Sequence, residues 1–125
     1  MSNVRWLPEP RAEEWDWQIH GLCRGRDSAT FFHPDGERGS ARVRRDNAAK
    51  AVCRVCPVRP ECAAQSLAAQ EPYGVWGGFT ESERTRLLIL GWQDAAHRFR
   101  RRVDIDKLEA KLGRDNERLT QAIAV

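Results

Sequence analysis

The sequence contains no long hydrophobic run and few aromatic residues. Its longest aliphatic stretch, Leu87 to Leu90, has four residues, whereas a helix that crosses a membrane needs about 18. Aromatic residues make up 8% of the 125 residues and the mean hydropathy is −0.67, so the buried core must be small. The N-terminal residues show neither the apolar stretch nor the cleavage site of a secretory signal. We therefore expect a soluble cytoplasmic protein without a membrane partner.

Strand patterns are also missing from the sequence. No segment convincingly alternates apolar and polar residues, and no internal repeat is present. Apolar residues recur at steps of three and four over residues 13–23 and 104–120, which predicts helices there. Further helices are predicted over 40–53, which is rich in Ala and Arg, over 61–70 after two prolines, and over 80–90 after a capping motif. The fold class that follows is a small all-α domain.

Proline, glycine and charge indicate how the chain is divided. Pro8 and Pro10 indicate a loose N-terminal tail over residues 1–12. The main domain is expected over residues 13–90, followed by a basic C-terminal segment over 91–125 that includes the last predicted helix.

Loops are predicted between the helices. Residues 24–40 are rich in Gly, Asp and Pro, and Pro57 and Pro60 are expected to break the chain before the third helix. Residues 72–78 form a predicted glycine turn that presents Trp76. The motif Thr80-Glu81-Ser82-Glu83, directly after it, is a capping box that opens the fourth helix.

The charge is unevenly distributed along the chain. Residues 1–83 contain 11 Lys and Arg against 12 Asp and Glu, whereas residues 84–125 contain 10 against 6. A total of +3 is too small to indicate nucleic-acid binding, but the local excess favours it. The basic residues that could contact phosphates are Arg98, Arg100, Arg101 and Arg102. The alternative is an exposed basic face without a partner, which is common.

Four cysteines are the strongest chemical signal. Their spacing is Cys23-x29-Cys53-x2-Cys56-x5-Cys62. In a reducing compartment this pattern favours a metal site or redox chemistry over a disulfide framework. A thioredoxin-type pair at Cys53 and Cys56 would need a βαβ context that is absent here. Apart from the thiols, the sequence offers no nucleophile paired with a base, so we expect no enzyme and no small-molecule substrate.

The cysteine spacing leaves the metal open. Structural zinc is usually held by two paired knuckles, and only one Cys-x2-Cys pair is present here. A single cysteine, a Cys-x2-Cys pair and a fourth cysteine are closer to iron–sulfur spacings, and Cys56-Pro57 is similar to the Cys-Pro of some ferredoxins. Spacing alone therefore favours a cluster over zinc without excluding zinc. Four unrelated thiols are a third alternative.

Several motifs in order resemble the WhiB-like (Wbl) family of bacterial regulators. They are the cysteine array, the pair Phe31-Phe32 after the first cysteine, and Gly74-Val75-Trp76-Gly77-Gly78 after the last. The stretch from Trp15-Asp16-Trp17 to Gly39 resembles the redox- and nitric-oxide-responsive branch of that family. The resemblance covers about residues 15–90 and lacks the Arg-Gly-Arg-Pro motif that some members carry.

The resemblance implies a [4Fe–4S] cluster on Cys23, Cys53, Cys56 and Cys62. It implies a redox-sensitive transcription regulator that binds the C-terminal domain of the principal sigma factor of RNA polymerase. It also implies that the basic C-terminal segment contacts promoter DNA. Loss of the cluster would free thiols that can pair as a disulfide, with Cys53 and Cys56 the nearest partners. A thiol–disulfide reductase and a zinc-stapled interaction module are the alternative functions.

Aromatic residues near the cysteines are candidate sigma contacts. The predicted set is Trp17, Phe31, Phe32 and Trp76. Large aromatic side chains often anchor interfaces, but a single tryptophan is also a common core residue. Arg24, Arg54 and Arg59 each lie near a cysteine in sequence and could neutralise an anionic cluster, or could simply be solvated.

Overall fold

The computed structural model describes residues 16–92 and 102–123. It contains two short 3-10 helices, η2 (Asp16–His20) and η3 (Ser28–Thr30), and four α-helices: α2 (Gly39–Arg54), α3 (Arg59–Ala68), α4 (Glu81–Leu90) and α5 (Ile105–Ile123). The described residues form no strand, and the predicted all-α class is confirmed for them. None of their helices is long and apolar enough to cross a membrane.

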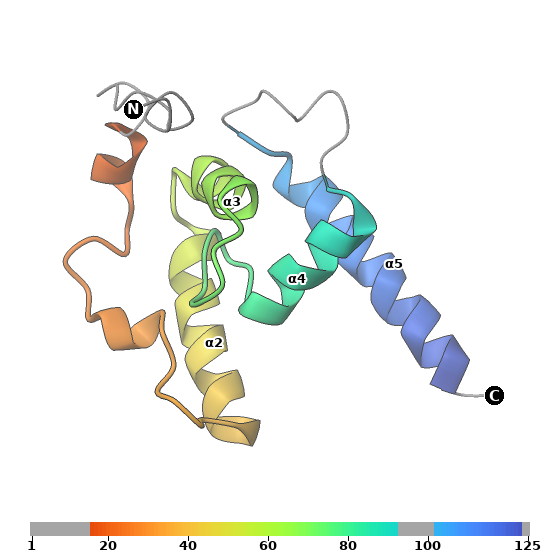
Figure 1. Cartoon of the computed structure of the whole chain (residues 1–125). Helices are drawn as coiled ribbons and strands as arrows, with labels where there is room; N and C mark the ends of the chain where they lie inside the picture. Colours follow the sequence, from red (N-terminus) through yellow and green to blue (C-terminus); the bar gives the residue numbers. More distant parts are fainter. Residues whose placement is uncertain (1–15, 93–101, 124–125) are drawn as a thin grey trace, which may run out of the picture.

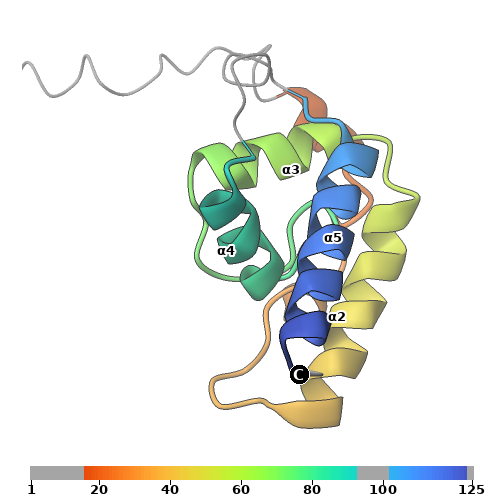
Figure 2. The same ribbon diagram turned by 90° about the vertical axis from the view of Figure 1, so that its right-hand side faces the viewer.

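The elements are arranged around the central helices α2, α3 and α4. The N-terminal segment, which carries η2 and η3, lies along one side of α2 and α3, and α5 lies on the opposite side (Figure 1). Helix α5 contacts α3 and α4, while η3 contacts α2. The view in Figure 2 shows α3 running across the direction of α5. Helix α3 therefore has the N-terminal segment on one face and α5 on another.

Two groups of buried side chains hold these elements together. The larger group comes from α3, α4, α5 and the residues beside them: Ala63, Ala64, Leu67, Phe79, Leu87, Trp92, Val103, Leu108 and Leu112. The smaller group joins the N-terminal segment to α2 and the loop before α4, and consists of Phe31, Ala49, Cys53 and Val75. The C-terminal helix thus contributes directly to the main core.

The predicted helices lie close to the observed ones. The capping box at the start of α4 is confirmed, because Thr80 accepts the backbone N–H of Glu83 and the Glu83 carboxylate accepts that of Thr80. The amphipathic helix predicted over 104–120 is confirmed as α5. Helix α3 begins two residues earlier than predicted, and Pro60 lies in its first turn. A proline is tolerated there because the N–H it lacks would have no partner inside the helix.

The helix predicted over residues 13–23 is wrong for the part that the structure describes. The chain forms the 3-10 helix η2 from Asp16 to His20 and then turns. Successive hydrogen bonds of the i to i+3 type link Gln18 to Gly21, Gly21 to Arg24, and Cys23 to Arg26. These tight turns replace an α-helix where the segment approaches the rest of the protein.

A buried arginine organises the loop between α3 and α4. Arg84 of α4 is 2% exposed, and its guanidinium donates four hydrogen bonds to backbone carbonyls. The acceptors are Gly74 and Phe79, each at 2.6 Å, with Glu71 at 3.1 Å and Tyr73 at 3.2 Å. Burial lowers the pKa of this guanidinium, which pairs with carbonyls rather than with a carboxylate. One side chain therefore holds both ends of the loop.

We predict that Arg84→Leu lowers the free energy of unfolding by about 3 kcal/mol or more, because four carbonyls lose their donor. Denaturant unfolding followed by circular dichroism measures this loss. Arg84→Lys keeps the charge but cannot reach four acceptors as the guanidinium does, and should be intermediate. An Arg84→Leu variant as stable as the wild type would show that the loop holds its shape without this residue.

Candidate functional site

The four cysteines come from separate parts of the fold. Cys53 lies in the last turn of α2 and is buried, and Cys56 lies in the break between α2 and α3. Cys62 lies in the first turns of α3, and Cys23 lies in the exposed N-terminal segment that faces these helices. All four are free thiols in the structure.

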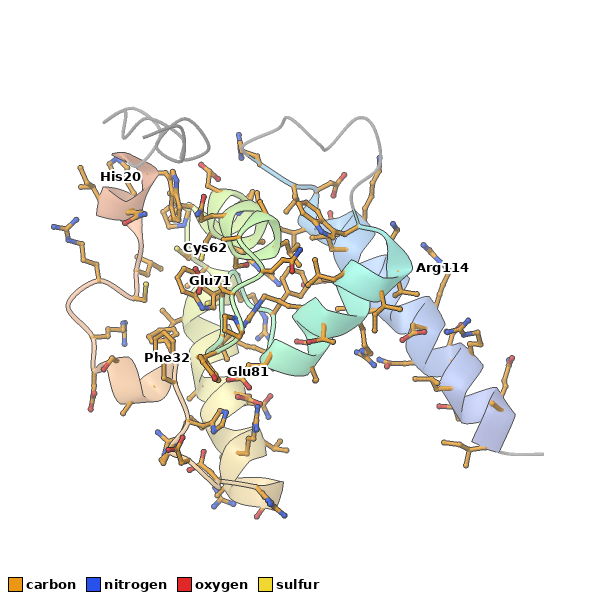
Figure 3. All side chains as sticks on the ribbon, viewed as in Figure 1. His20, Phe32, Cys62, Glu71, Glu81 and Arg114 are labelled. Atoms are coloured by element: carbon orange, nitrogen blue, oxygen red, sulfur yellow. The ribbon has the colours of Figure 1, made fainter. Side chains whose placement is uncertain are left out.

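The four cysteines line one cavity of about 480 Å³. Its lining comes from the N-terminal segment, the last turn of α2, the first turns of α3 and the glycine turn. Figure 3 labels two of these residues, Phe32 and Cys62. Apolar side chains contribute much of its wall, among them Val52, Val58 and Val75. The structure thus brings together the four cysteines that the sequence predicts as ligands. A site of soft sulfur donors with apolar walls suits a thiophilic metal centre.

Burial shapes the acidity of two of these thiols. Burial raises the pKa of Cys53, and it raises the pKa of Cys62 to about 12, with the neighbouring cysteines adding to the effect. Burial therefore favours the protonated forms of these two thiols. Binding a cationic centre requires thiolates and must release protons, so its affinity increases with pH.

Backbone amides partly offset this burial. The N–H groups of Gly78 and Gly77 favour the thiolates of Cys53 and Cys62 and lower their pKa values. The N–H of Leu22 donates to Cys56 Sγ at 3.5 Å. Hydrogen bonds to sulfur stabilise a coordinated thiolate and tune the potential of an iron–sulfur centre. Sequence analysis assigns the glycines only to a turn, although their position after the last cysteine could have suggested this second role.

The glycine turn is held in place by close contacts. Gly77 has a φ of +58°, and a Cβ on it would lie 2.7 Å from the backbone nitrogen of Ala63 in α3. Gly74 has a φ of +83°, and a Cβ there would lie 2.5 Å from the ring of Phe32. Only glycine combines these backbone angles with such an approach. The turn therefore packs against α3 on one side and the N-terminal segment on the other.

The predicted aromatic residues gather at the cavity. Trp17, Phe31, Phe32 and Trp76 all line it. Phe31 is 8% exposed and belongs to the smaller core, while Phe32 is 44% exposed. Trp76 is half-buried, and its indole N–H donates to the carbonyl of Tyr73 at 2.8 Å. Phe31 is thus a core residue that also faces the cavity, and the other three offer accessible aromatic surface.

Some of the arginines that the sequence analysis singles out line the cavity. Arg24 and Arg59 line it, together with Arg26, whereas Arg54 does not. Arg59 donates to the carbonyl of Gly77 at 2.8 Å, and its guanidinium lies 5.5 Å from the ring centre of Phe79. Its charge favours the thiolate of Cys53. Arg59 is therefore the best-ordered cation beside the cysteines.

A polar cluster outside the cavity connects the N-terminal segment to α4 and α2. Glu81 accepts hydrogen bonds from the backbone N–H of Gly74 at 2.8 Å, from Arg42 at 3.0 Å and from His33 at 3.1 Å. Burial opposes the ionisation of Glu81, but these three donors outweigh it and lower its pKa. The other ring nitrogen of His33 lies 2.9 Å from the Pro34 carbonyl. Sequence analysis missed this cluster, since Glu81 resembles an ordinary residue of a capping box.

Most of the predicted DNA contacts lie outside the described residues. Arg98, Arg100 and Arg101 belong to that group, whereas Arg102 is exposed and pairs with Glu61 at 3.4 Å.

Comparison with known proteins identifies a family. A family model described as transcription factor WhiB matches residues 17–87, which include all four cysteines. The transcriptional regulator WhiD of Streptomyces coelicolor is 60% identical over 88 residues, which cover 70% of this chain and 79% of WhiD. The redox-responsive transcriptional regulator WhiB3 of Mycolicibacterium smegmatis is 55% identical over 96 residues, covering 77% of this chain and 100% of that protein. The redox- and pH-responsive transcriptional regulator WhiB3 of Mycobacterium tuberculosis is 60% identical over 88 residues, covering 70% of this chain and 86% of that protein.

We predict that the contact between His33 and Glu81 makes stability depend on pH. Hydrogen bonds with Pro34 and Glu81 outweigh desolvation and raise the pKa of His33 above 6.5. The contribution of His33 is therefore complete below pH 6.5 and is lost as the pH rises through its folded-state pKa. That of Glu81 is complete above its unfolded-state pKa and is lost in acid.

The measurement is urea unfolding of wild type and His33→Gln at pH 6 and pH 8. The stability advantage of the wild type should be larger at pH 6. His20→Gln, at an exposed histidine of η2, is the matched control and should show no such dependence. An equal difference at the two pH values would contradict the role assigned to His33.

Proposed function

The chain belongs to the WhiB family of transcription factors, and from that membership we propose that it is a redox-responsive transcriptional regulator built around a [4Fe–4S] cluster. The observation that supports this most directly is the shared cavity of Cys23, Cys53, Cys56 and Cys62. Three separate segments must come together to form it. Such a centre stabilises the fold as well as sensing its surroundings, because metal binding and folding are coupled.

The spacing of the cysteines favours a cluster over a single zinc ion, because only one Cys-x2-Cys pair is present. The four cysteines line one cavity of about 480 Å³, in which each could bind a different iron of a multi-iron centre.

The chain's own residues would hold the cluster and adjust its environment. The four thiolates would bind it, and the cluster would supply a redox-active centre that oxygen or nitric oxide can modify. A cluster of charge 2+ with four thiolates carries about −2 in total. The amides of Leu22, Gly77 and Gly78 face sulfur atoms and Arg59 supplies a positive charge, so the site offsets part of that charge. Val52, Val58 and Val75 give the cavity a partly apolar wall.

We propose that the partly exposed aromatic side chains at the cavity form the docking surface for the C-terminal domain of the principal sigma factor of RNA polymerase. Trp17, Phe32 and Trp76 line the cavity and remain partly exposed. Aromatic anchors carry much of the energy of protein interfaces. Because these residues share a wall with the cysteines, the state of the metal centre and the shape of the docking surface are linked.

The basic C-terminal segment is proposed to contact promoter DNA. Each phosphate that an arginine neutralises contributes about −0.9 to the slope of log affinity against log salt. Contacts from Arg98, Arg100, Arg101 and Arg102 alone give weak binding, so attachment to sigma would be needed to raise the local concentration. The protein would act in the cytoplasm with RNA polymerase and without catalytic activity.

Cys53 does not fit the role of the attacking thiol in a thiol–disulfide reductase. Such enzymes use an accessible cysteine with a lowered pKa as the attacking thiolate. Cys53 is buried and its pKa is raised, which is the opposite of what that chemistry needs.

We predict that anaerobic purification yields a coloured protein with about four iron and four acid-labile sulfide per chain. Replacing any of the four cysteines with serine should remove most of both. Iron and sulfide analysis is the measurement, and visible absorbance follows the same centre. Stoichiometric zinc without sulfide would support the zinc-stapled module, and insulin reduction by the cluster-free chain would support the reductase.

We predict that Trp76→Ala keeps its iron and sulfide but weakens sigma binding by about 30-fold, the equivalent of about 2 kcal/mol. Calorimetry with the purified sigma domain measures the affinity. The matched control is Tyr73→Ala, since Tyr73 is exposed in the same loop and does not line the cavity. Unchanged sigma affinity in Trp76→Ala would show that the indole is only a packing residue.

A further inference from the structure

Arg59 connects the cysteine cavity to the C-terminal helix. It is the first residue of α3, midway in sequence between Cys56 and Cys62, and its side chain lines the cavity. The guanidinium has three neighbours. Its Nε donates to the Gly77 carbonyl at 2.8 Å, its Nη2 donates to Glu109 Oε1 at 2.7 Å, and its plane lies near the ring of Phe79. The same cation thus contacts the glycine turn and α5.

The partner of Arg59 comes from outside the region that the family model matches. That match ends at residue 87, and Glu109 lies in α5, between the buried residues Leu108 and Leu112. Helix α5 is fixed against α3 and α4, so Glu109 is held at a defined position although its side chain is 51% exposed. The side chain of Arg59 is only 16% exposed.

The exposure of Glu109 indicates that its ion pair with Arg59 contributes little to stability. An ion pair with one solvated member adds little to stability, typically below 1 kcal/mol. Its larger effect is on geometry and charge at the cavity. Glu109 fixes one end of the guanidinium and also offsets part of its positive charge.

We infer that Glu109 is a positioning residue through which helix α5 sets the positive charge that Arg59 presents to the metal centre. The inference rests on the proposed function, because it assigns regulation to the same site. Removing the carboxylate would strengthen the positive field at the cavity, and a more positive cavity attracts anionic reactants. The C-terminal helix thereby influences which oxidants reach the centre and how fast.

The test compares reagents that differ in charge. In the iron-loaded protein, the rate of cluster loss is measured with ferricyanide, a trianion, and with oxygen, which is neutral. Glu109→Gln should raise the ferricyanide-to-oxygen rate ratio about two- to fivefold at low salt, with the increase disappearing at high salt. Glu117→Gln removes the same charge from an exposed position of α5 and should leave the ratio unchanged. A change in overall stability alone would move both rates together.

A double variant separates positioning from direct charge. If Glu109 acts mainly through Arg59, the effect of Glu109→Gln on the ratio should be much smaller when Arg59→Gln is also present, because only the direct charge of Glu109 is then lost. A rise of equal size in both backgrounds, or a ratio that does not change in Glu109→Gln, overturns the inference.

The cluster-free chain gives an independent readout. Its thiols are reacted with an anionic and with a neutral aromatic disulfide, and the ratio of the two rates reports the local field because the same thiolate attacks both. Glu109→Gln should raise this ratio and Arg59→Gln should lower it. If even the wild type takes up no iron and sulfide, the proposed function fails, and this second ratio decides the role of Glu109 separately.

Discussion

The buried guanidinium of Arg84 is the constraint on which the site depends. Residues 69–80 cross from α3 to α4 without forming a helix or strand, and they must keep their backbone carbonyls satisfied away from water. Arg84 supplies donors to four of them. The loop can then place Gly77 and Gly78 against the cysteines and Gly74 against Glu81. A polar side chain in the core thus shapes a region that no hydrophobic pattern specifies.

Helix α3 contributes residues to both the cysteine cavity and the hydrophobic core. Its first turns provide Arg59 and Cys62 to the cavity. The residues that follow, Ala63, Ala64 and Leu67, belong to the core shared with α4 and α5. The metal centre and the hydrophobic core are therefore adjacent rather than separate. A change in the cavity acts on the same short helix that anchors the C-terminal helix.

The sequence predicts the parts of this architecture that follow from local patterns. Periodicity and capping locate α2, α4 and α5, and the spacing of the cysteines predicts that they share one site. These patterns do not predict η2, where a 3-10 helix followed by turns with i to i+3 bonds replaces the expected α-helix. Nor do they predict the roles of His33 and Glu109, whose partners lie far along the chain, or of Arg84, whose partners depend on how the preceding loop folds. Such pairings are set by tertiary structure, and an arginine or a glutamate on a helix surface looks alike in sequence whether or not it is paired.

The contact between Gly77 and Ala63 limits how this chain can diverge. A methyl group on Gly77 would overlap the backbone and Cβ of Ala63, which is itself completely buried. Neither position has room for a larger residue unless the two segments separate, and separating them withdraws the amides from the sulfur atoms. Exposed positions of α5, such as Arg114 and Glu117, have no such constraint and can change one at a time. At this junction, a lineage must either keep both small residues or rebuild the loop as a whole.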